Sequence, residues 1–176
     1  MRLKILAISG SLRSSSSNLS ILRLAASLLP AEIEYEICTG LETIPPFNPD
    51  LDREPAPGPV SAFRKKIKDA DGVLFCTPEY AFGVPGALKN ALDWTVSSGE
   101  FTDKPVALIT ASSQGSKAHE SLQHTLSAIG TKFTNAETLL ISFIKAKMNS
   151  LGEVTDVPTQ LAIKEVVNNF LQAMRT

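Results

Sequence analysis

The apolar positions of this chain form five short clusters, separated by segments of a different pattern. Residues 3–8, 72–77 and 105–111 are almost continuously apolar, as is typical of strands buried on both faces of a sheet. Residues 33–37 alternate apolar and acidic side chains, which predicts a strand near a sheet edge. Residues 138–144 predict a last strand. The pattern therefore predicts five strands spread along the chain.

Between these clusters, apolar residues recur at the spacing of an amphipathic helix. The predicted helices span residues 18–30, 60–70, 85–96, 116–129 and 158–174. Residues 41–59 follow no period and are rich in proline, which predicts a long loop. Loops of that length inside a domain often serve as lids or partner-binding segments.

The alternation of strands and helices predicts a parallel sheet with helices on both faces. Five such units in 176 residues predict a single α/β domain over residues 1–176. The expected architecture is a flavodoxin-like three-layer sandwich with a five-stranded parallel sheet of order 2-1-3-4-5.

The composition narrows the class of function. The formal charge is −1, with 43% hydrophobic and 20% charged residues, close to the average of soluble domains. A chain without a basic excess is not expected to bind nucleic acid. No apolar run approaches the roughly 18 residues of a membrane span, and the apolar start is too short for a signal peptide. We therefore expect a cytoplasmic protein that associates with neither nucleic acid nor membrane.

The two cysteines are expected to be reduced and buried. In the predicted strand order, strand 1 lies between the strands of Cys38 and Cys76. Two strand spacings amount to roughly 9.5 Å, which exceeds the Cα separation that a disulfide tolerates.

A ligand site is expected where the predicted strand order reverses, between strands 1 and 3. In open α/β sheets, ligands bind beyond the carboxyl ends of the strands at this switch point. The loop after strand 1 covers residues 9–18, and the loop after strand 3 covers residues 78–85. These two loops are also the most unusual stretches of the sequence, and the topology predicts that they lie side by side.

The loop at residues 9–18 has the chemistry of a phosphate site. It leads into a helix N-terminus, where free backbone N–H groups favour an anion, and it adds serine hydroxyls and the fork of Arg13. It lacks the lysine of a Walker A loop and the three glycines of a dinucleotide loop. A flexible serine-rich turn with Ser17 or Asn18 as helix cap explains the same residues without a ligand.

Two motifs together resemble the NADPH-dependent FMN reductase family, which includes quinone, azo-dye and chromate reductases. They are Gly10-Ser11-Leu12-Arg13-x-x-Ser16-x-Asn18 and Pro78-Glu79-Tyr80-x-x-x-x-Pro85-Gly86-x-Leu88-Lys89-Asn90-Ala91-x-Asp93-Trp94. The resemblance implies a flavoenzyme that binds FMN non-covalently and takes hydride from NADPH or NADH. The reduced flavin would then reduce a flavin, quinone, azo compound or similar acceptor by two electrons, in ping-pong fashion.

The resemblance also implies roles for ten residues. The FMN phosphate would be held by Ser11, Arg13, Ser16, Ser17 and Asn18. The isoalloxazine ring would be bordered by Pro78, Glu79, Tyr80 and Ala81, and its other edge by Ser112. No catalytic acid or base is assigned, because the cofactor supplies the chemistry. The helix at residues 86–94 resembles the family's dimer-forming helix, which implies a homodimer or a dimer of dimers.

The sequence departs from the family pattern at two places. Position 81 is often Asn in the family and is Ala here, so one side-chain hydrogen bond to the ring or its surroundings is missing. After strand 4 the family often has paired glycines and an arginine, whereas residues 113–118 here read SQGSKA.

A flavodoxin-type electron carrier without NAD(P)H activity is the main alternative. Flavodoxins are usually strongly acidic and sandwich the ring between aromatic side chains. The net charge of −1 and an aromatic content of 6% disfavour this alternative, although Tyr80 or Phe82 could stack on a ring. A flavin-free regulatory domain is disfavoured by the intact Arg13 loop and Pro-Glu-Tyr motif.

Two further patterns are interpreted as structural. His119 and His124 are five residues apart, about 140° around a helix, whereas a zinc-binding pair needs a separation of four. We therefore expect surface or half-buried histidines and no metal site. The basic run at residues 64–68 is expected to be the solvated face of its helix.

Overall fold

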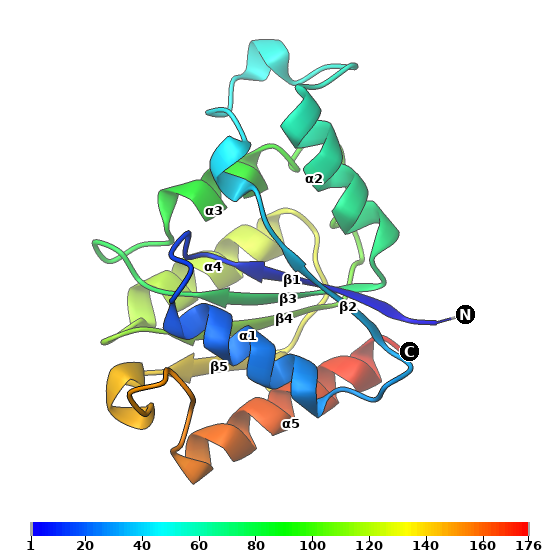
Figure 1. The fold of residues 1–176 in the computed structure, drawn as a ribbon. Coiled ribbons are helices and arrows are strands. Elements are labelled where there is room, and N and C mark those ends of the chain that lie inside the picture. The colour runs from blue at the N-terminus through cyan, green and yellow to red at the C-terminus, as the bar shows by residue number, and fades with distance from the viewer. Residues whose placement is uncertain (1, 176) are drawn as a thin grey trace.

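A computed structural model, which describes residues 2–175, contains one five-stranded parallel sheet (Figure 1). The strand order is β2-β1-β3-β4-β5, which confirms the predicted flavodoxin-like topology. The strands are β1 (Lys4–Ser9), β2 (Glu34–Cys38), β3 (Gly72–Thr77), β4 (Val106–Ala111) and β5 (Thr138–Ile141).

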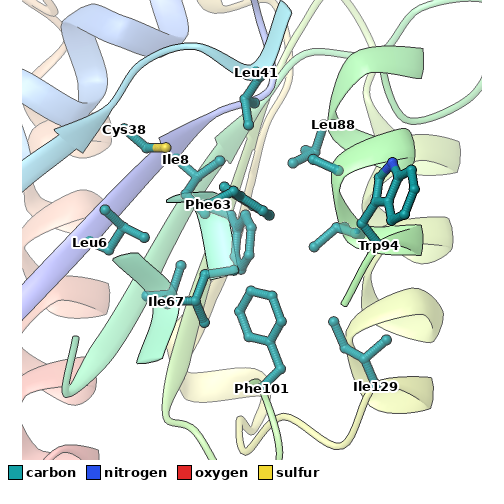
Figure 2. Close-up of a cluster of buried hydrophobic side chains, with 14 of the residues drawn as sticks. Leu6, Ile8, Cys38, Leu41, Phe63, Ile67, Leu88, Trp94, Phe101 and Ile129 are labelled. Atoms are coloured by element: carbon teal, nitrogen blue, oxygen red, sulfur yellow. The ribbon is translucent and has the colours of Figure 1, made fainter. Parts of the chain in front are cut away.

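Helices cover both faces of the sheet, as Figure 1 shows. The helices are α1 (Ser17–Leu28), α2 (Gly58–Asp69), α3 (Gly86–Asp93), α4 (Ser116–Ala128) and α5 (Val157–Ala173). Successive strand residues point to opposite faces, so Ile5 packs in the cluster under α1 and α5. Leu6 packs in the cluster under α2, α3 and α4, part of which Figure 2 shows. None of the helices within residues 2–175 has the length and apolar character needed to cross a lipid bilayer.

Two predicted element ends were wrong. Helix α3 ends at Asp93, and Val96 is 63% exposed instead of continuing the apolar stripe. The chain leaves the helix there because the Thr95 hydroxyl donates to the Leu92 carbonyl and the Thr95 N–H bonds to the same group. Strand β5 ends at Ile141 rather than at residue 144, because Phe143 adopts a left-handed conformation that no strand accommodates.

The two cysteines are free and buried, as predicted. Strand β1 lies between their strands, with Ile8 paired to Cys38 and Ser9 paired to Cys76. Burial raises the pKa of both thiols, so both remain protonated near neutral pH.

The predicted long loop is held against α3. It contains two short 3₁₀ turns, η1 (Leu41–Thr43) and η2 (Pro49–Leu51). The Asn90 side chain accepts from the Phe47 N–H at 2.7 Å and donates to the Pro45 carbonyl at 2.9 Å. The Trp94 indole N–H donates to the same carbonyl at 2.8 Å. The later part of the second motif therefore anchors this segment, and the fully buried Trp94 side chain has no surface to offer a partner.

The expectation of a fully solvated basic face on α2 was wrong for Arg64. Its side chain is buried and forms an ion pair of 2.6 Å with Asp52, which lies in the long loop. The guanidinium also donates to the Trp94 carbonyl. The second Asp52 oxygen accepts from the Ser97 hydroxyl at 2.6 Å. Arg64 thus joins the long loop, α2 and the end of α3.

The Asp52 carboxylate should contribute stability that acid removes. The hydrogen bond from Ser97, followed by Arg64, lowers the pKa of Asp52 below its ordinary value of about 3.9. Its stabilising effect is therefore complete above about pH 4 and is lost as the pH falls through the lowered pKa. We expect Asp52→Asn to cost about 2–3 kcal/mol at pH 7, because Arg64 loses its buried counter-charge.

Thermal unfolding followed by circular dichroism between pH 7 and pH 3 measures this effect. The Tm of Asp52→Asn should lie about 5–10 °C below that of the unmodified protein at pH 7. The gap should narrow below pH 4. Asp50→Asn, at an exposed position in η2, is the matched control and should change little. A gap that is constant with pH would contradict the role of the charge.

Candidate functional site

The loops after β1 and β3 meet at the switch point, as the topology predicts. The Gly10 N–H donates to the Cys76 carbonyl at 2.9 Å, which continues the contact between the two strands into the first loop. A Cβ at Gly10 would lie 2.2 Å from the Thr77 hydroxyl, so only glycine permits this approach. Further out, the Ser11 hydroxyl lies 3.4 Å from the Tyr80 hydroxyl. These contacts fix the two loops side by side.

The loop after β1 is an ordered turn held by its own serines. The Ser9 hydroxyl donates to the Ser11 carbonyl and accepts from the Ser11 N–H. The Ser11 hydroxyl in turn accepts from the Arg13 N–H at 3.3 Å. The N-cap of α1 is Ser16, whose hydroxyl accepts from the Leu19 N–H at 3.1 Å, so neither Ser17 nor Asn18 is the cap.

Asn18 lies deeper than a surface phosphate ligand and is only 3% exposed. Its side-chain nitrogen donates to the Ala111 carbonyl at 3.4 Å, and its oxygen accepts from the Cys76 thiol at 3.2 Å. These bonds tie the first turn of α1 to the carboxyl ends of β3 and β4. The amide therefore helps to position the surrounding loop.

A cavity of about 220 Å³ opens above these loops, and we call it the switch-point cavity. Nine of the ten predicted site residues line it. The exception is Ala81, which is exposed in the turn beyond Tyr80. Sequence reasoning missed Lys145, which lines the cavity from the 3₁₀ turn η4 (Ile144–Lys147) directly after β5. Its position beyond the carboxyl end of a strand was the available signal.

Glu79 caps a helix from another part of the chain. Its carboxylate accepts from the backbone N–H groups of Lys117 and Ala118, both at 2.9 Å, and of Gly115 at 3.3 Å. These donors are the free N–H groups at the start of α4, where the helix dipole favours a negative charge. The bonds fix the loop between β4 and α4 against the loop after β3. They also engage the carboxylate, so its charge is partly offset at the cavity.

The β4–α4 loop is fixed from its other side as well. The Ser112 N–H donates to the Ile141 carbonyl at 3.2 Å, and the Ser112 carbonyl accepts from the Ile144 N–H at 3.2 Å. These bonds place Ser112 and Lys145 on the same wall of the switch-point cavity.

The tip of the loop after β3 is a tight turn in an unusual conformation. Tyr80 and Gly83 exchange two backbone hydrogen bonds of 3.0 and 2.9 Å across Ala81 and Phe82. Both central residues are left-handed, with φ of 49° at Ala81 and 60° at Phe82. Turns of this kind favour Asn and Gly, which adopt positive φ at low cost. Asn at position 81, which the resemblance implies for many family members, would therefore suit the backbone of this turn.

The histidines take no part in this site. The His119 ring nitrogen Nδ1 lies 2.9 Å from the Thr110 hydroxyl, and burial lowers the pKa of His119. His124 is exposed on the same helix. Within residues 2–175, no group of three or more His, Cys, Asp or Glu side chains is arranged to hold a metal ion.

Comparisons with known proteins agree with this geometry. The sequence model of one family, NADPH-dependent FMN reductase, matches residues 3–146. The chain is 34% identical to the NAD(P)H-dependent FMN reductase PA1204 of Pseudomonas aeruginosa, covering 98% of this chain and 94% of that protein. It is 32% identical to a quinone reductase of Escherichia coli, covering 90% and 88%.

A solved structure is also similar over nearly its whole length. The flavoenzyme FerB of Paracoccus denitrificans, an NAD(P)H:(acceptor) oxidoreductase, superposes with a TM-score of 0.79 at 26% identity. The match covers 98% of this chain and 97% of FerB.

The cap by Glu79 should be measurable as stability. Glu79→Ala leaves three N–H groups of α4 without their carboxylate, and we expect a loss of about 2 kcal/mol. For a chain of this size, the loss corresponds to a Tm lowered by about 4–8 °C in thermal unfolding. Glu120→Ala is the matched control, because Glu120 lies exposed on α4 and forms only an exposed ion pair with Lys117. Equal Tm values for the two variants would contradict the cap.

The left-handed backbone at Ala81 predicts a substitution that raises the stability of the protein. Ala81→Gly should stabilise the protein by about 0.5–1 kcal/mol, because glycine adopts the left-handed conformation without a Cβ clash. We expect a Tm raised by about 1–4 °C. The control is Ala87→Gly within α3, which should lower the Tm because glycine disfavours a regular helix. A lowered Tm for both variants would show that the turn is not strained.

Proposed function

The chain belongs to the NADPH-dependent FMN reductase family, and we propose that it holds FMN in the switch-point cavity and passes electrons from NAD(P)H to a small acceptor. Its similarity to an NAD(P)H-dependent FMN reductase and to a quinone reductase over most of their length supports this activity. When bound, FMN supplies the carrier that accepts a hydride from NAD(P)H and gives two electrons to the acceptor. The single observation that carries the proposal is the joining of both motif loops around one cavity.

The donor set of the cavity suits a phosphate monoester. Arg13 and Lys145 contribute two positive charges, and neither side chain has an ion pair within residues 2–175. Ser15 and Ser17 add hydroxyls at the start of α1, where backbone N–H groups are free. The nearby carboxylate of Glu79 is bound by α4 and so opposes a phosphate less than a free carboxylate would.

The predicted ligands divide into two groups in this proposal. Arg13, Ser17 and Lys145 bind the phosphate directly. Ser16 and Asn18 act mainly through the positions of α1 and the strands, since their side chains already bond within the protein.

The ring of FMN would lie toward the loop after β3. Tyr80 and Pro78 line that side of the cavity, and Ser112 lines the side formed by the β4–α4 loop. Glu79 fixes the distance between these two walls by holding the start of α4. The backbone of both loops is thereby set before a ring binds, which lowers the cost of binding.

We further propose that the chain acts in the cytoplasm as a homodimer or a dimer of dimers, on a quinone or a similar acceptor. Support for the dimer comes from the resemblance of residues 86–94 to the family's dimer-forming helix. Support for a quinone comes from the name of the Escherichia coli relative. A second copy would wall the cavity beside Tyr80, whose neighbour in the chain, Phe82, is 74% exposed.

An absorbance spectrum followed by anaerobic addition of NADPH tests the function. We expect the purified protein to carry bands near 375 and 450 nm, about the positions of a flavin, which bleach on addition of NADPH or NADH. Bands that persist with both nucleotides would favour the electron-carrier alternative. Failure to take up added FMN would overturn the proposal.

The same titration tests the phosphate site at the level of one residue. Arg13→Ala should raise the Kd for FMN about 10- to 100-fold, because a charge-assisted bond to the phosphate is lost. Arg53→Ala, an exposed arginine in the long loop, is the matched control and should leave the Kd unchanged. An unchanged Kd for Arg13→Ala would remove Arg13 from the site.

A further inference from the structure

A second hollow, of about 460 Å³, lies beside the switch-point cavity. One wall is the start of α1, and the other is the hairpin at residues 148–154, so we call it the hairpin hollow. Figure 1 shows the segment between β5 and α5 at the same end of the sheet as the start of α1. The hollow and the cavity share Arg13, Ser15, Ser17 and Lys145. A phosphate bound by these residues would therefore have the hollow directly beside it.

The hairpin hollow carries positive charge without an acidic residue in its lining. Arg13, Arg23 and Lys145 line it, and of the residues that the structure describes no Asp or Glu does. Within residues 2–175, none of these three side chains has a salt bridge or a side-chain hydrogen bond to another residue. A third hollow, on the β2 side, also contains Arg13 and Arg23 but adds Glu42. Of these two hollows, the hairpin hollow therefore has the lining that favours an anion.

The hairpin wall is ordered and ends in an apolar tip. Met148 and Val154 pair across it, and the Asn149 side chain accepts from the backbone N–H groups of Leu151 at 3.0 Å and Glu153 at 2.9 Å. Leu151 is 82% exposed and lines the hollow together with Met148. The hollow thus combines cations, serine hydroxyls and an apolar surface.

We propose that the hairpin hollow binds the adenylate half of a dinucleotide flavin, so that the chain accepts FAD as well as FMN. The inference rests on the proposed function, because the flavin phosphate in the cavity is what brings a second phosphate to the hollow. Arg23 and Lys145 bind that second phosphate, the hydroxyls of Ser20 and Ser150 face the ribose, and Leu151 packs on the base. An adenylate group offers these three kinds of surface in one ligand.

Flavin-free protein titrated separately with FMN and with FAD tests the inference. We expect a Kd for FAD within about tenfold of that for FMN, and chromatography of the bound flavin should recover intact FAD. Arg23→Ala should raise the Kd for FAD about tenfold, because one charge-assisted bond is lost. The Kd of this variant for FMN should stay within twofold of the value for the unmodified protein, since Arg23 does not line the switch-point cavity. Arg53→Ala is the control for a lost arginine.

A second variant separates the hairpin hollow from the β2-side hollow, which shares Arg23. Ser150 is exposed and lines only the hairpin side, so Ser150→Glu places a negative charge there. We expect Ser150→Glu to weaken FAD binding several-fold and to leave FMN binding unchanged. Ser121→Glu, at an exposed position of α4, is the matched control and should change neither.

The outcomes distinguish this inference from the function on which it rests. Binding of FMN without FAD, or equal effects of Arg23→Ala on both flavins, overturns this inference alone. If the unmodified protein binds neither FMN nor FAD, the proposed function is overturned and the inference with it. If Arg23→Ala raises the KM for NADPH but not for NADH, with an unchanged Kd for FAD, the hollow binds the 2′-phosphate of NADPH and the FAD assignment is wrong.

Discussion

The rest of the site depends on the close approach of the loop after β1 to strand β3. At Gly10 the backbone comes so near Thr77 that any side chain would collide with it, and the Gly10 N–H bonds to the Cys76 carbonyl. This contact exists because the parallel sheet places β1 beside β3, although a helix, a strand and a second helix separate them in the chain. The approach aligns the serine loop with the loop that contains Glu79 and Tyr80.

Polar side chains around the switch-point cavity fall into two groups with different tasks. Ser16, Asn18 and Glu79 bond to backbone or buried groups and hold α1, β3, β4 and α4 in place. Among the described residues 2–175, Arg13 and Lys145 form no such bonds with other side chains, so they remain available to a ligand. A motif therefore contains residues that build the site as well as residues that bind, and sequence alone does not separate them. Hydrogen bonding separates them, because a buried polar group must be satisfied whether or not a ligand is bound.

The fold could be predicted because its strands and helices follow clear patterns of apolar residues. The errors occurred at positions whose environment is set by contacts between distant parts of the chain. The three apolar runs predicted the central strands, and the switch-point rule placed both loops at one cavity. Arg64 looked like part of a solvated face, because only the folded chain brings Asp52 and the Trp94 carbonyl to it. Lys145 was missed because only the folded chain shows that the turn after β5 reaches the cavity between the loops of β1 and β3.

Within residues 2–175, three of the four non-glycine residues with positive φ lie in turns next to the cavity, and the fourth, Asp103, lies elsewhere. Ala81 and Phe82 are left-handed in the turn after β3, and Phe143 is left-handed after β5. Residues in this conformation cost energy, and they persist only where neighbouring contacts hold them. Here the paired hydrogen bonds of Tyr80 and Gly83 hold one turn, and the bond from the Phe143 N–H to the Ser113 carbonyl holds the other. Both turns carry an exposed aromatic side chain. Because these bonds fix the rim before any ring enters, the aromatic side chains can present apolar surface to a ligand or a second copy at little further cost in backbone entropy.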